Sequence, residues 1–307
     1  MRIQDMRAVP PFRWPYRTAR EHRVHEFVDP ATGRVLRVMG IGRIDPAETA
    51  SRPAGPGGEY NHRHRHNFDQ LYLRLRLPLP SSGADPVEPI SGTLEYRPDG
   101  LWYGPFEKKR ASAAADSIAV FCGLQTAGAS GTPFITKEQA VAAAAKLERE
   151  GPGRYDRETG DYLAPDGREQ DFYEATWETA MGRAATYPEP ARADAIMTFP
   201  LSAYRWQPSP TDRGVQLKRI VSFGAGDPEV ELVKLGAAAT IDGRTSQAYE
   251  FTAILAGRLR FGERTLSDLH VLDAGPGSVY ERVVADEPTL LWVVRWRPGG
   301  VAPGPSR

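Results

Sequence analysis

The sequence is short of cysteine, of any excess of one charge and of long apolar runs. Its 307 residues contain one cysteine, Cys122, which excludes an internal disulfide and a cysteine-rich metal site and favours a reducing, cytoplasmic location. Lys and Arg together number 39, as do Asp and Glu, so no basic excess is present to neutralise nucleic-acid phosphates. No segment near the start is apolar enough for a signal peptide or a membrane span. We therefore expect neither nucleic acid nor a membrane as a partner.

Turn-forming residues, in contrast, are plentiful. The 30 Gly and 27 Pro follow no fixed period, which predicts many turns and many short strands. Strands are expected at residues 35–44, 68–77, 92–97 and 117–123, and again at 230–235, 266–272, 278–284 and 289–296. A hairpin is expected at residues 249–260, with Gly257 near its turn.

The middle of the chain has a different pattern. A capping-box sequence precedes an Ala-rich run that stops at Gly151, which predicts a helix over residues 137–150. A second helix is expected over residues 171–183, where Tyr173, Trp177 and Met181 form an apolar stripe. Two β-rich halves on either side of a helical segment indicate a duplicated β-sandwich or barrel.

Histidine is concentrated in one segment, residues 58–70, which holds three of the six histidines. On a strand, alternate residues share a face, so His62, His64, His66 and Gln70 point one way and Arg63, Arg65 and Asp69 the other. Neighbouring imidazoles on that face are about 7 Å apart along the backbone and can converge on one ion, whereas three in a row span about 13 Å. Two of the three histidines are therefore expected to bind one metal.

At these residues the first half resembles the cupin superfamily. Gly58, His64, His66 and Gln70 keep the spacing of the first cupin motif, with Gln in place of Glu, while the closing Gly is replaced by Leu77. The second motif has its counterpart in Gly92, Pro98, Gly100, Tyr103 and Glu107, where Tyr replaces His and Glu replaces Asn.

The second half repeats the pattern more faintly. Arg244 and Ser246 stand at the two histidine places, Glu250 keeps the acid, and Tyr280 stands where the last histidine would be. A carboxylate without imidazole partners is a poor transition-metal site, so this half is expected to be a metal-free structural cupin.

The whole chain therefore resembles a bicupin. That resemblance implies a mainly β fold, a duplicated cupin made of double-stranded β-helix (jelly-roll) barrels with a small helical bridge. The expected domains are an amino-terminal arm (1–34), a metal-binding cupin (35–125), a helical bridge (126–214), a degenerate cupin (215–300) and a tail (301–307).

The resemblance also implies one divalent transition metal, with Fe favoured and Mn, Ni, Co or Zn as alternatives. His64 and His66 would be its imidazole ligands and Gln70 a neutral oxygen ligand. Tyr103 would orient a substrate or donate a proton, and Trp102 and Glu107 would contact the substrate. A rival register uses His62, His64 and Asp69, and it requires a β-bulge that turns Asp69 inward.

The leading hypothesis is a metal-dependent enzyme that acts on a small organic molecule, with an oxygen-using oxidoreductase of the dioxygenase type as the favoured form. The alternatives are a non-catalytic ligand-binding or regulatory cupin and a metal-assisted isomerase or hydrolase. The histidine run also has a plain reading as a solvated basic strand edge.

Leucines alternate with polar residues from Leu71 to Leu77. If the even positions face the barrel interior, the leucines lie on its outer face. That apolar face must be buried by the bridge, the other cupin or a second subunit, so a homodimer is one expected arrangement.

Overall fold

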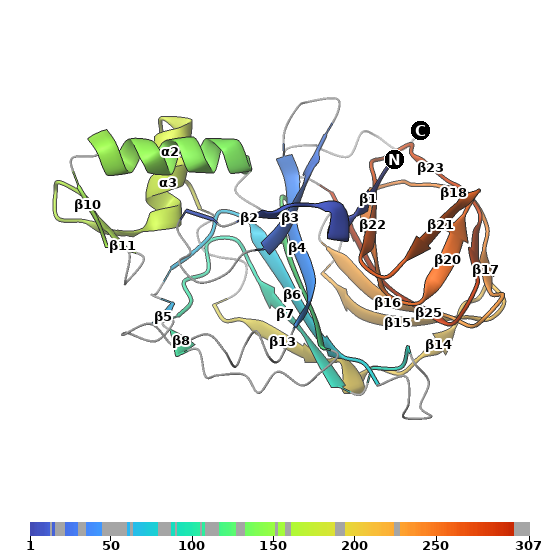
Figure 1. The fold of residues 1–307 in the computed structure, drawn as a ribbon. Coiled ribbons are helices and arrows are strands. Elements are labelled where there is room, and N and C mark those ends of the chain that lie inside the picture. Colours follow the sequence, from blue (N-terminus) through green and yellow to red (C-terminus); the bar gives the residue numbers. More distant parts are fainter. Residues whose placement is uncertain are drawn as a thin grey trace, which may run out of the picture.

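The computed structural model has two seven-stranded antiparallel sheets, with two helices at one end of the molecule and a second β-barrel at the other (Figure 1). It describes residues 1–12, 14–15, 22–29, 35–44, 60–61, 64–78, 87–89, 91–104, 106–107, 117–126, 133–150, 153–156, 161–187, 194–223 and 228–297. The expected mainly β fold is confirmed. In the described part of the chain, no helix has the length and apolar character needed to cross a membrane.

The first sheet contains the strands expected in the first half. Its order is β13 (Met197–Pro200), β7 (Ser91–Arg97), β6 (Asp69–Arg76), β9 (Ser117–Leu124), β4 (Val35–Ile44), β3 (His22–Val28) and β2 (Pro11–Phe12). The strands β5 (Tyr60–Asn61) and β8 (Phe106–Glu107) pair with each other and form a separate two-stranded sheet.

The second half forms the more completely described barrel. Its large sheet runs β1 (Arg2–Asp5), β22 (His270–Ala274), β19 (Tyr249–Ala256), β25 (Thr289–Trp296), β16 (Glu229–Leu235), β15 (Val215–Ser222) and β14 (Gln207–Pro208). Its smaller sheets are β17 (Thr240–Ile241), β24 (Val283–Ala285), β20 (Arg258–Phe261) and β21 (Arg264–Ser267), and the pair β18 (Arg244–Thr245) and β23 (Val279–Tyr280).

The segments outside the two expected cupins join both sheets. Within residues 1–34, β1 pairs with β22 of the second sheet, whereas β2 and β3 belong to the first. At the end of the 126–214 segment, β13 pairs with β7 and β14 pairs with β15. Short 3-10 turns follow β1 at Met6–Ala8 and β13 at Leu201–Ala203. The arm and the bridge thus contribute strands as well as connections.

The helical part consists of α2 (Lys137–Glu150), α3 (Phe172–Met181) and a small sheet of β10 (Arg154–Asp156), β11 (Asp161–Leu163) and β12 (Glu169–Asp171). The predicted helix 137–150 is confirmed to the residue. Tyr173 and Trp177 of the predicted stripe are buried against Val24, Val35 and Val38 of the first sheet. The helices therefore dock on the first half through the stripe that the sequence indicates.

The predicted hairpin at residues 249–260 is wrong. β19 pairs with β22 and β25, whereas β20 pairs with β21 and β24, so the chain changes sheet between the two strands. Gly257 is the corner, with a φ of 88°, and a Cβ there would lie 2.2 Å from the Pro288 carbonyl oxygen. Only glycine accommodates both the left-handed backbone and that close approach.

The row of leucines on β6 packs against the other cupin. Leu71, Leu73 and Leu75 are buried in a core that also includes Phe251 and Trp292 of the second sheet. This core occupies the space between the two large sheets, so the row needs no second subunit to cover it. Cys122 lies in the same core, and burial raises the pKa of its thiol to about 12, which makes it a packing residue.

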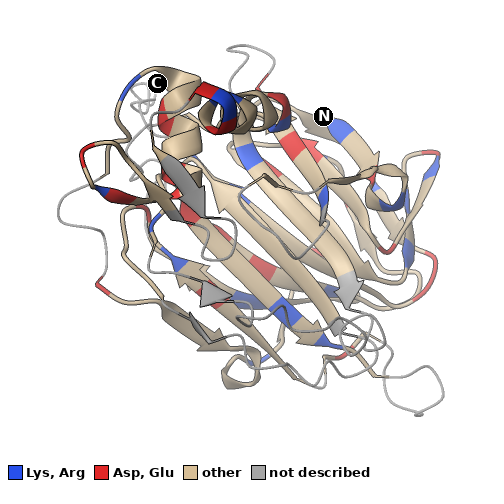
Figure 2. Ribbon diagram, turned by 60° about the vertical axis from the view of Figure 1, so that its left-hand side comes forward, with Lys and Arg blue, Asp and Glu red and all other residues tan. Residues whose placement is uncertain are grey.

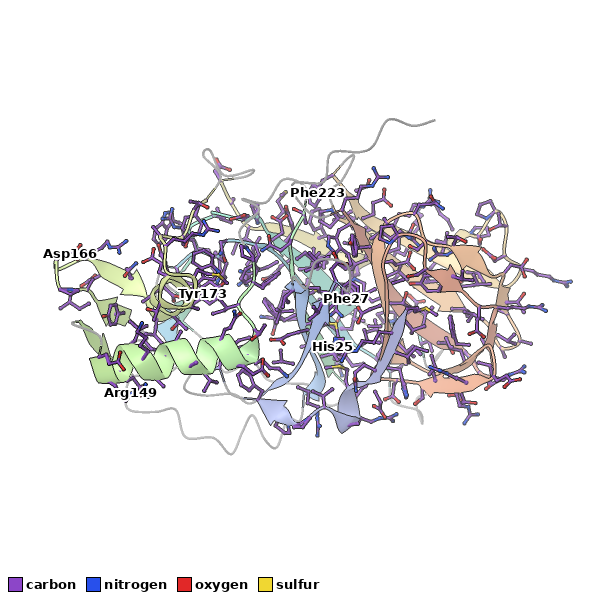
Figure 3. All side chains as sticks on the ribbon, turned by 90° about the horizontal axis from the view of Figure 1, so that it is seen from above. His25, Phe27, Arg149, Asp166, Tyr173 and Phe223 are labelled. Atoms are coloured by element: carbon purple, nitrogen blue, oxygen red, sulfur yellow. The ribbon has the colours of Figure 1, made fainter. Side chains whose placement is uncertain are left out.

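A buried ion pair crosses between the halves. Arg37 on β4 donates to the Asp273 carboxylate on β22, and both side chains are almost fully buried. The His25 Nδ1 atom lies 3.3 Å from Arg37 Nη2 and 3.6 Å from Asp273 Oδ2. Figure 3 shows His25 and Phe27 on the strands between the helical part and the second barrel.

Outside this ion pair, positively and negatively charged residues alternate along the ribbon (Figure 2).

Stability is expected to fall at acidic pH because of His25. Burial, together with the charge of Arg37, lowers the pKa of His25 from 6.5 to about 3. Between these two pH values the imidazole binds a proton in the unfolded chain but not in the folded chain. The contribution is fully present above pH 6.5 and is lost as the pH falls towards 3, at up to ~1.4 kcal/mol per pH unit. Urea unfolding of the wild type and of His25→Gln at about pH 7 and about pH 5 measures it. Equal pH dependence in the two proteins would contradict the assignment.

The Arg37–Asp273 pair is expected to be costly to break from one side. Arg37→Met leaves the Asp273 carboxylate buried without its guanidinium, at a cost of about 3–5 kcal/mol in the free energy of unfolding. Arg37→Met/Asp273→Asn removes the buried charge as well and is expected to be more stable than the single variant. Urea titration of the three proteins tests this, and a double variant no more stable than Arg37→Met would refute it.

Candidate functional site

The histidine segment and the segment around Tyr103 are held together by backbone hydrogen bonds. His64 and Tyr103 form an antiparallel bridge, in which each N–H donates to the other residue's carbonyl at 2.9 and 3.0 Å. The Gly100 N–H donates to the His66 carbonyl at 2.9 Å. The two segments that carry the motif residues are therefore neighbours, as the paired spacing of the sequence predicts.

A tight turn brings the second segment back across the first. The Leu101 N–H donates to the Pro98 carbonyl at 3.2 Å, and Gly100 between them has a φ of 78°. A type II turn needs positive φ at its third residue, which is why glycine stands there. The turn directs the chain so that Tyr103 meets His64.

The side chains of four predicted site residues form one cluster. The ring centroids of His64 and His66 are 5.2 Å apart, and the Tyr103 ring lies 4.3 Å from His64 and 5.9 Å from His66. The Gln70 Nε2 donates to the Tyr103 hydroxyl oxygen at 2.8 Å. All four side chains are buried. The structure therefore brings together His64, His66, Gln70 and Tyr103.

Asp69 lies on the other face of β6, where its carboxylate accepts hydrogen bonds from neighbouring segments. Its carboxylate accepts from the Tyr96 hydroxyl at 3.0 Å, from the Asp99 N–H at 2.8 Å and from the Thr126 hydroxyl. β6 pairs with β7 and β9 without a register shift from Asp69 to Arg76, so the bulge that the rival register requires is absent from this strand. Asp69 thus braces the turn at Pro98–Leu101. His62, the remaining residue of that register, lies outside the described residues.

Aromatic side chains enclose the cluster. Phe68 stacks on His66 at 4.8 Å with an interplanar angle of 19°, and Tyr173 from α3 meets the edge of His66 at 4.7 Å. The Tyr173 hydroxyl donates to Asn67 Oδ1 at 2.8 Å, and Phe134 packs on Phe68 at 4.6 Å. The bridge therefore supplies part of the wall, which keeps bulk water from this side of the imidazoles.

Two arginines near the cluster were not predicted. Arg97 is the partner of Gln70 in the β6–β7 ladder, and its guanidinium carbon lies 4.9 Å from the Tyr103 ring centroid. Burial lowers the pKa of Arg97, but the oxygens of Tyr103 and Glu95 outweigh that effect and raise it. Arg97 therefore stays charged beside the phenol. The register of the β6–β7 hairpin, which places Arg97 opposite Gln70, is the signal that could have indicated this arginine.

The second arginine, Arg65, lies between the two histidines in sequence and faces outward. It forms a long ion pair with Glu174 of α3, at 4.0 Å, and stacks on Tyr187 and Trp102 with centroid distances of 3.6 and 4.6 Å. Burial raises the pKa of Glu174, and Arg65 opposes that shift. The contacts with Glu174 and Tyr187 join the histidine segment to the bridge over more than a hundred residues of sequence, so no local pattern indicates them.

The two residues expected to contact a substrate lie less centrally. Trp102 precedes Tyr103, is 45% exposed and packs on Arg65, on the side away from Gln70. Glu107 pairs through its backbone with Tyr60, and its side chain lies outside the described part. Substrate contact by either residue stays a prediction.

A metal centre with two imidazole ligands has a characteristic spacing of the two rings. An ion bound about 2.1 Å from an imidazole nitrogen lies roughly 3.2 Å from that ring's centroid, so two adjacent ligands have centroids about 5 Å apart. The 5.2 Å between His64 and His66 matches one shared ion. Because Gln70 directs its nitrogen to Tyr103, its oxygen is the atom left for a metal. Among the described residues, no group of three or more His, Cys, Asp or Glu forms such a centre, so the amide is the third donor available here.

Comparison with known proteins identifies the fold. No protein-family model and no curated protein matches the chain. A solved structure from Nostoc punctiforme, described as a "putative dioxygenase", is similar over 98% of this chain and 84% of its own, with a TM-score of 0.52 and 10% identity. The chain has the cupin fold, built twice.

Two smaller proteins match over about a third of the chain. An RmlC-like cupin protein from Ralstonia eutropha is 13% identical, with a TM-score of 0.29, over 31% of this chain and 65% of its own. An acetylacetone dioxygenase from Acinetobacter johnsonii is 8% identical, with a TM-score of 0.28, over 31% of this chain and 68% of its own.

Asp69 is expected to matter for folding rather than for ligand binding. Asp69→Ala leaves three donors without their acceptor, each worth about 1–3 kcal/mol when buried, so the free energy of unfolding should fall by about 3 kcal/mol or more. Gln70→Ala removes one such bond and is expected to cost less. Urea unfolding in the presence of a chelator keeps metal from contributing. Equal losses in the two variants would contradict this role.

Proposed function

We propose that this protein, whose fold is the cupin barrel built twice, is a metal-dependent enzyme acting on a small organic molecule in its first barrel. The observation that carries the proposal is the cluster of His64, His66, Gln70 and Tyr103, which is buried and has the spacing of a two-imidazole centre. His64, His66 and the Gln70 oxygen would hold one divalent transition metal, with Fe favoured. When bound, that metal would supply Lewis-acid and redox chemistry with coordination positions to spare.

The protein's own groups suit proton transfer beside that centre. The Tyr103 hydroxyl oxygen accepts from Gln70, so its hydrogen is directed elsewhere and can be donated to a substrate. Arg97 places a positive charge next to the Tyr103 ring and favours a substrate that carries or develops negative charge. A neutral amide in place of a carboxylate leaves the full charge of the ion available to such a substrate.

An oxygen-using reaction of the dioxygenase type is the form of this function that we favour. Two imidazoles with spare positions are typical of centres that admit both oxygen and substrate. The description of the Nostoc punctiforme structure as a "putative dioxygenase" agrees with this choice. Oxygen consumption that requires both the metal and a substrate would support it, whereas turnover without oxygen would assign an isomerase or hydrolase at the same cluster.

Metal content is the test of the proposal. Protein purified without a histidine tag, incubated with Fe²⁺ without oxygen and gel-filtered, is expected to retain about one ion per chain by elemental analysis. His64→Ala/His66→Ala is expected to retain less than about a tenth of that amount, because it lacks both imidazoles. His270→Ala, which removes an imidazole from the second barrel, is the matched control. Full loading of the double variant, or no loading of the wild type, would refute the proposal.

A further inference from the structure

The second barrel encloses a cavity that the metal proposal does not use. Its volume is about 480 Å³, within the range of small-molecule sites. About half of its lining residues are aliphatic or aromatic, among them Val215, Leu217, Val233, Ile254, Phe261 and Leu291. Such a wall favours an occupant with an apolar body.

One side of the cavity carries a row of alternating charges. Arg244 donates to the Glu250 carboxylate, whose other oxygen accepts from Arg295 Nε at 2.7 Å. Arg295 Nη1 donates to Glu231 at 2.8 Å, and Arg219 Nε donates to Glu231 at 3.2 Å. Three guanidinium groups and two carboxylates leave this row with one positive charge in excess, whereas the other carboxylates of the lining, Asp212, Asp242 and Glu281, lie outside the row.

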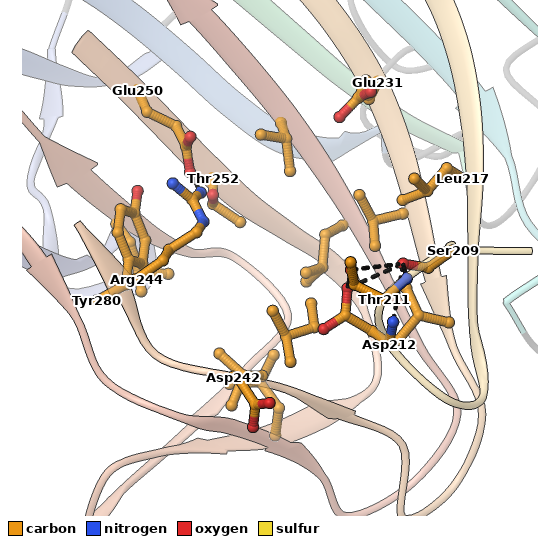
Figure 4. A pocket seen from close by; sticks show the side chains of 18 of the residues that line it. Ser209, Thr211, Asp212, Leu217, Glu231, Asp242, Arg244, Glu250, Thr252 and Tyr280 are labelled. Atoms are coloured by element: carbon orange, nitrogen blue, oxygen red, sulfur yellow. Dashed lines mark hydrogen bonds and ion pairs between the residues drawn. The ribbon is translucent and has the colours of Figure 1, made fainter. Parts of the chain in front are cut away.

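Arg244 ends the row on the side of Tyr280, and both residues line the cavity. Its side chain is 39% exposed, whereas its partner Glu250 is 1% exposed. Its guanidinium carbon lies 4.4 Å from the Tyr280 ring centroid, and burial together with Glu250 raises the pKa of Tyr280, which keeps that phenol neutral. Figure 4 shows Arg244 beside Tyr280 and Glu250 on one side of the cavity, with Ser209, Thr211 and Asp212 on the other.

This arrangement replaces a metal centre with a fixed guanidinium. Arg244 and Glu250 stand at motif positions where the first half has His64 and Gln70. Among the described residues, the ion pair with Glu250 is the one salt bridge of Arg244, and it engages one of its terminal nitrogens. A guanidinium has five N–H donors in a planar fork that matches a carboxylate, so donors remain for a ligand.

We infer that the second barrel binds a small monocarboxylate with an apolar body, its carboxylate on Arg244 and its body against the aliphatic wall. A monoanion held on Arg244 matches the one positive charge in excess within the row of ion pairs. A phosphate dianion would meet Glu250 and Glu231 with too little positive charge to offset them. The inference is independent of the metal site in the first barrel.

Calorimetric titration of the full-length wild type with benzoate and with benzamide tests the charge requirement directly. The two probes have nearly the same shape, and only benzoate offers a charged partner to Arg244. Benzoate is expected to bind more tightly than benzamide by about tenfold to a hundredfold, the range of a charge-assisted hydrogen bond. Inorganic phosphate is expected not to bind.

Arg244→Met locates the binding. Glu250 keeps its bond to Arg295 in this variant, so the barrel retains its remaining ion pairs. The preference for benzoate over benzamide is expected to vanish. Arg264→Met, which removes an exposed arginine from β21 outside the cavity, is the matched control and is expected to keep the wild-type preference.

Each remaining outcome counts against the inference. Equal affinity for the acid and the amide in the wild type, or no heat of binding for benzoate at millimolar concentration, would overturn it without any variant. A benzoate preference that persists in Arg244→Met would overturn the role of Arg244. If that variant does not fold, Arg244→Lys keeps the charge without the planar fork and is expected to weaken benzoate binding while leaving benzamide unchanged.

Discussion

Strand pleating sends successive side chains of each long strand to opposite faces, and on β25 both faces are buried over nearly the whole strand. On β25, Leu290, Trp292 and Val294 lie in the core between the two large sheets, while Leu291 and Val293 line the second barrel. The same alternation on β6 sends the leucines to the inter-sheet core and Gln70 to Tyr103, which packs on His64. A slip of one residue would exchange these faces, so the register of the sheets fixes both the union of the halves and the site.

The two barrels have different side chains at equivalent motif positions. In the first, His64 and His66 meet beside a neutral amide and a phenol, which suits a bound cation. In the second, a guanidinium takes the place of the imidazoles and is held by a buried carboxylate, which suits a bound anion. On the account proposed above, duplication therefore gave one barrel for reaction and one for a carboxylate ligand, joined by a core that leaves both interiors separate.

Much of this arrangement could be predicted from the sequence because it depends on local patterns. The strands Val35–Ile44 and Thr289–Trp296 and the helix Lys137–Glu150 have clear periodicity or capping signals, and the paired motif spacing brought His64 and Tyr103 together. What escaped prediction depends on distant parts of the chain. In the sequence, Gly257 between two apolar runs has the pattern of a hairpin turn. The strand pairing shows instead that the chain changes sheet there, with Gly257 packed against the Pro288 carbonyl oxygen. Tyr173 reaches Asn67 across 106 residues, and β1 joins a sheet whose other strands begin two hundred residues later.

The central claim is that two imidazoles of the first barrel hold one metal ion. X-ray absorption at the metal edge of Fe²⁺-loaded protein measures the ligands of that ion directly. The account predicts imidazole scattering from two rings, with the remaining ligands oxygen, and its loss in His64→Ala/His66→Ala. A wild-type spectrum with oxygen ligands alone, or one that the double substitution leaves unchanged, would contradict it.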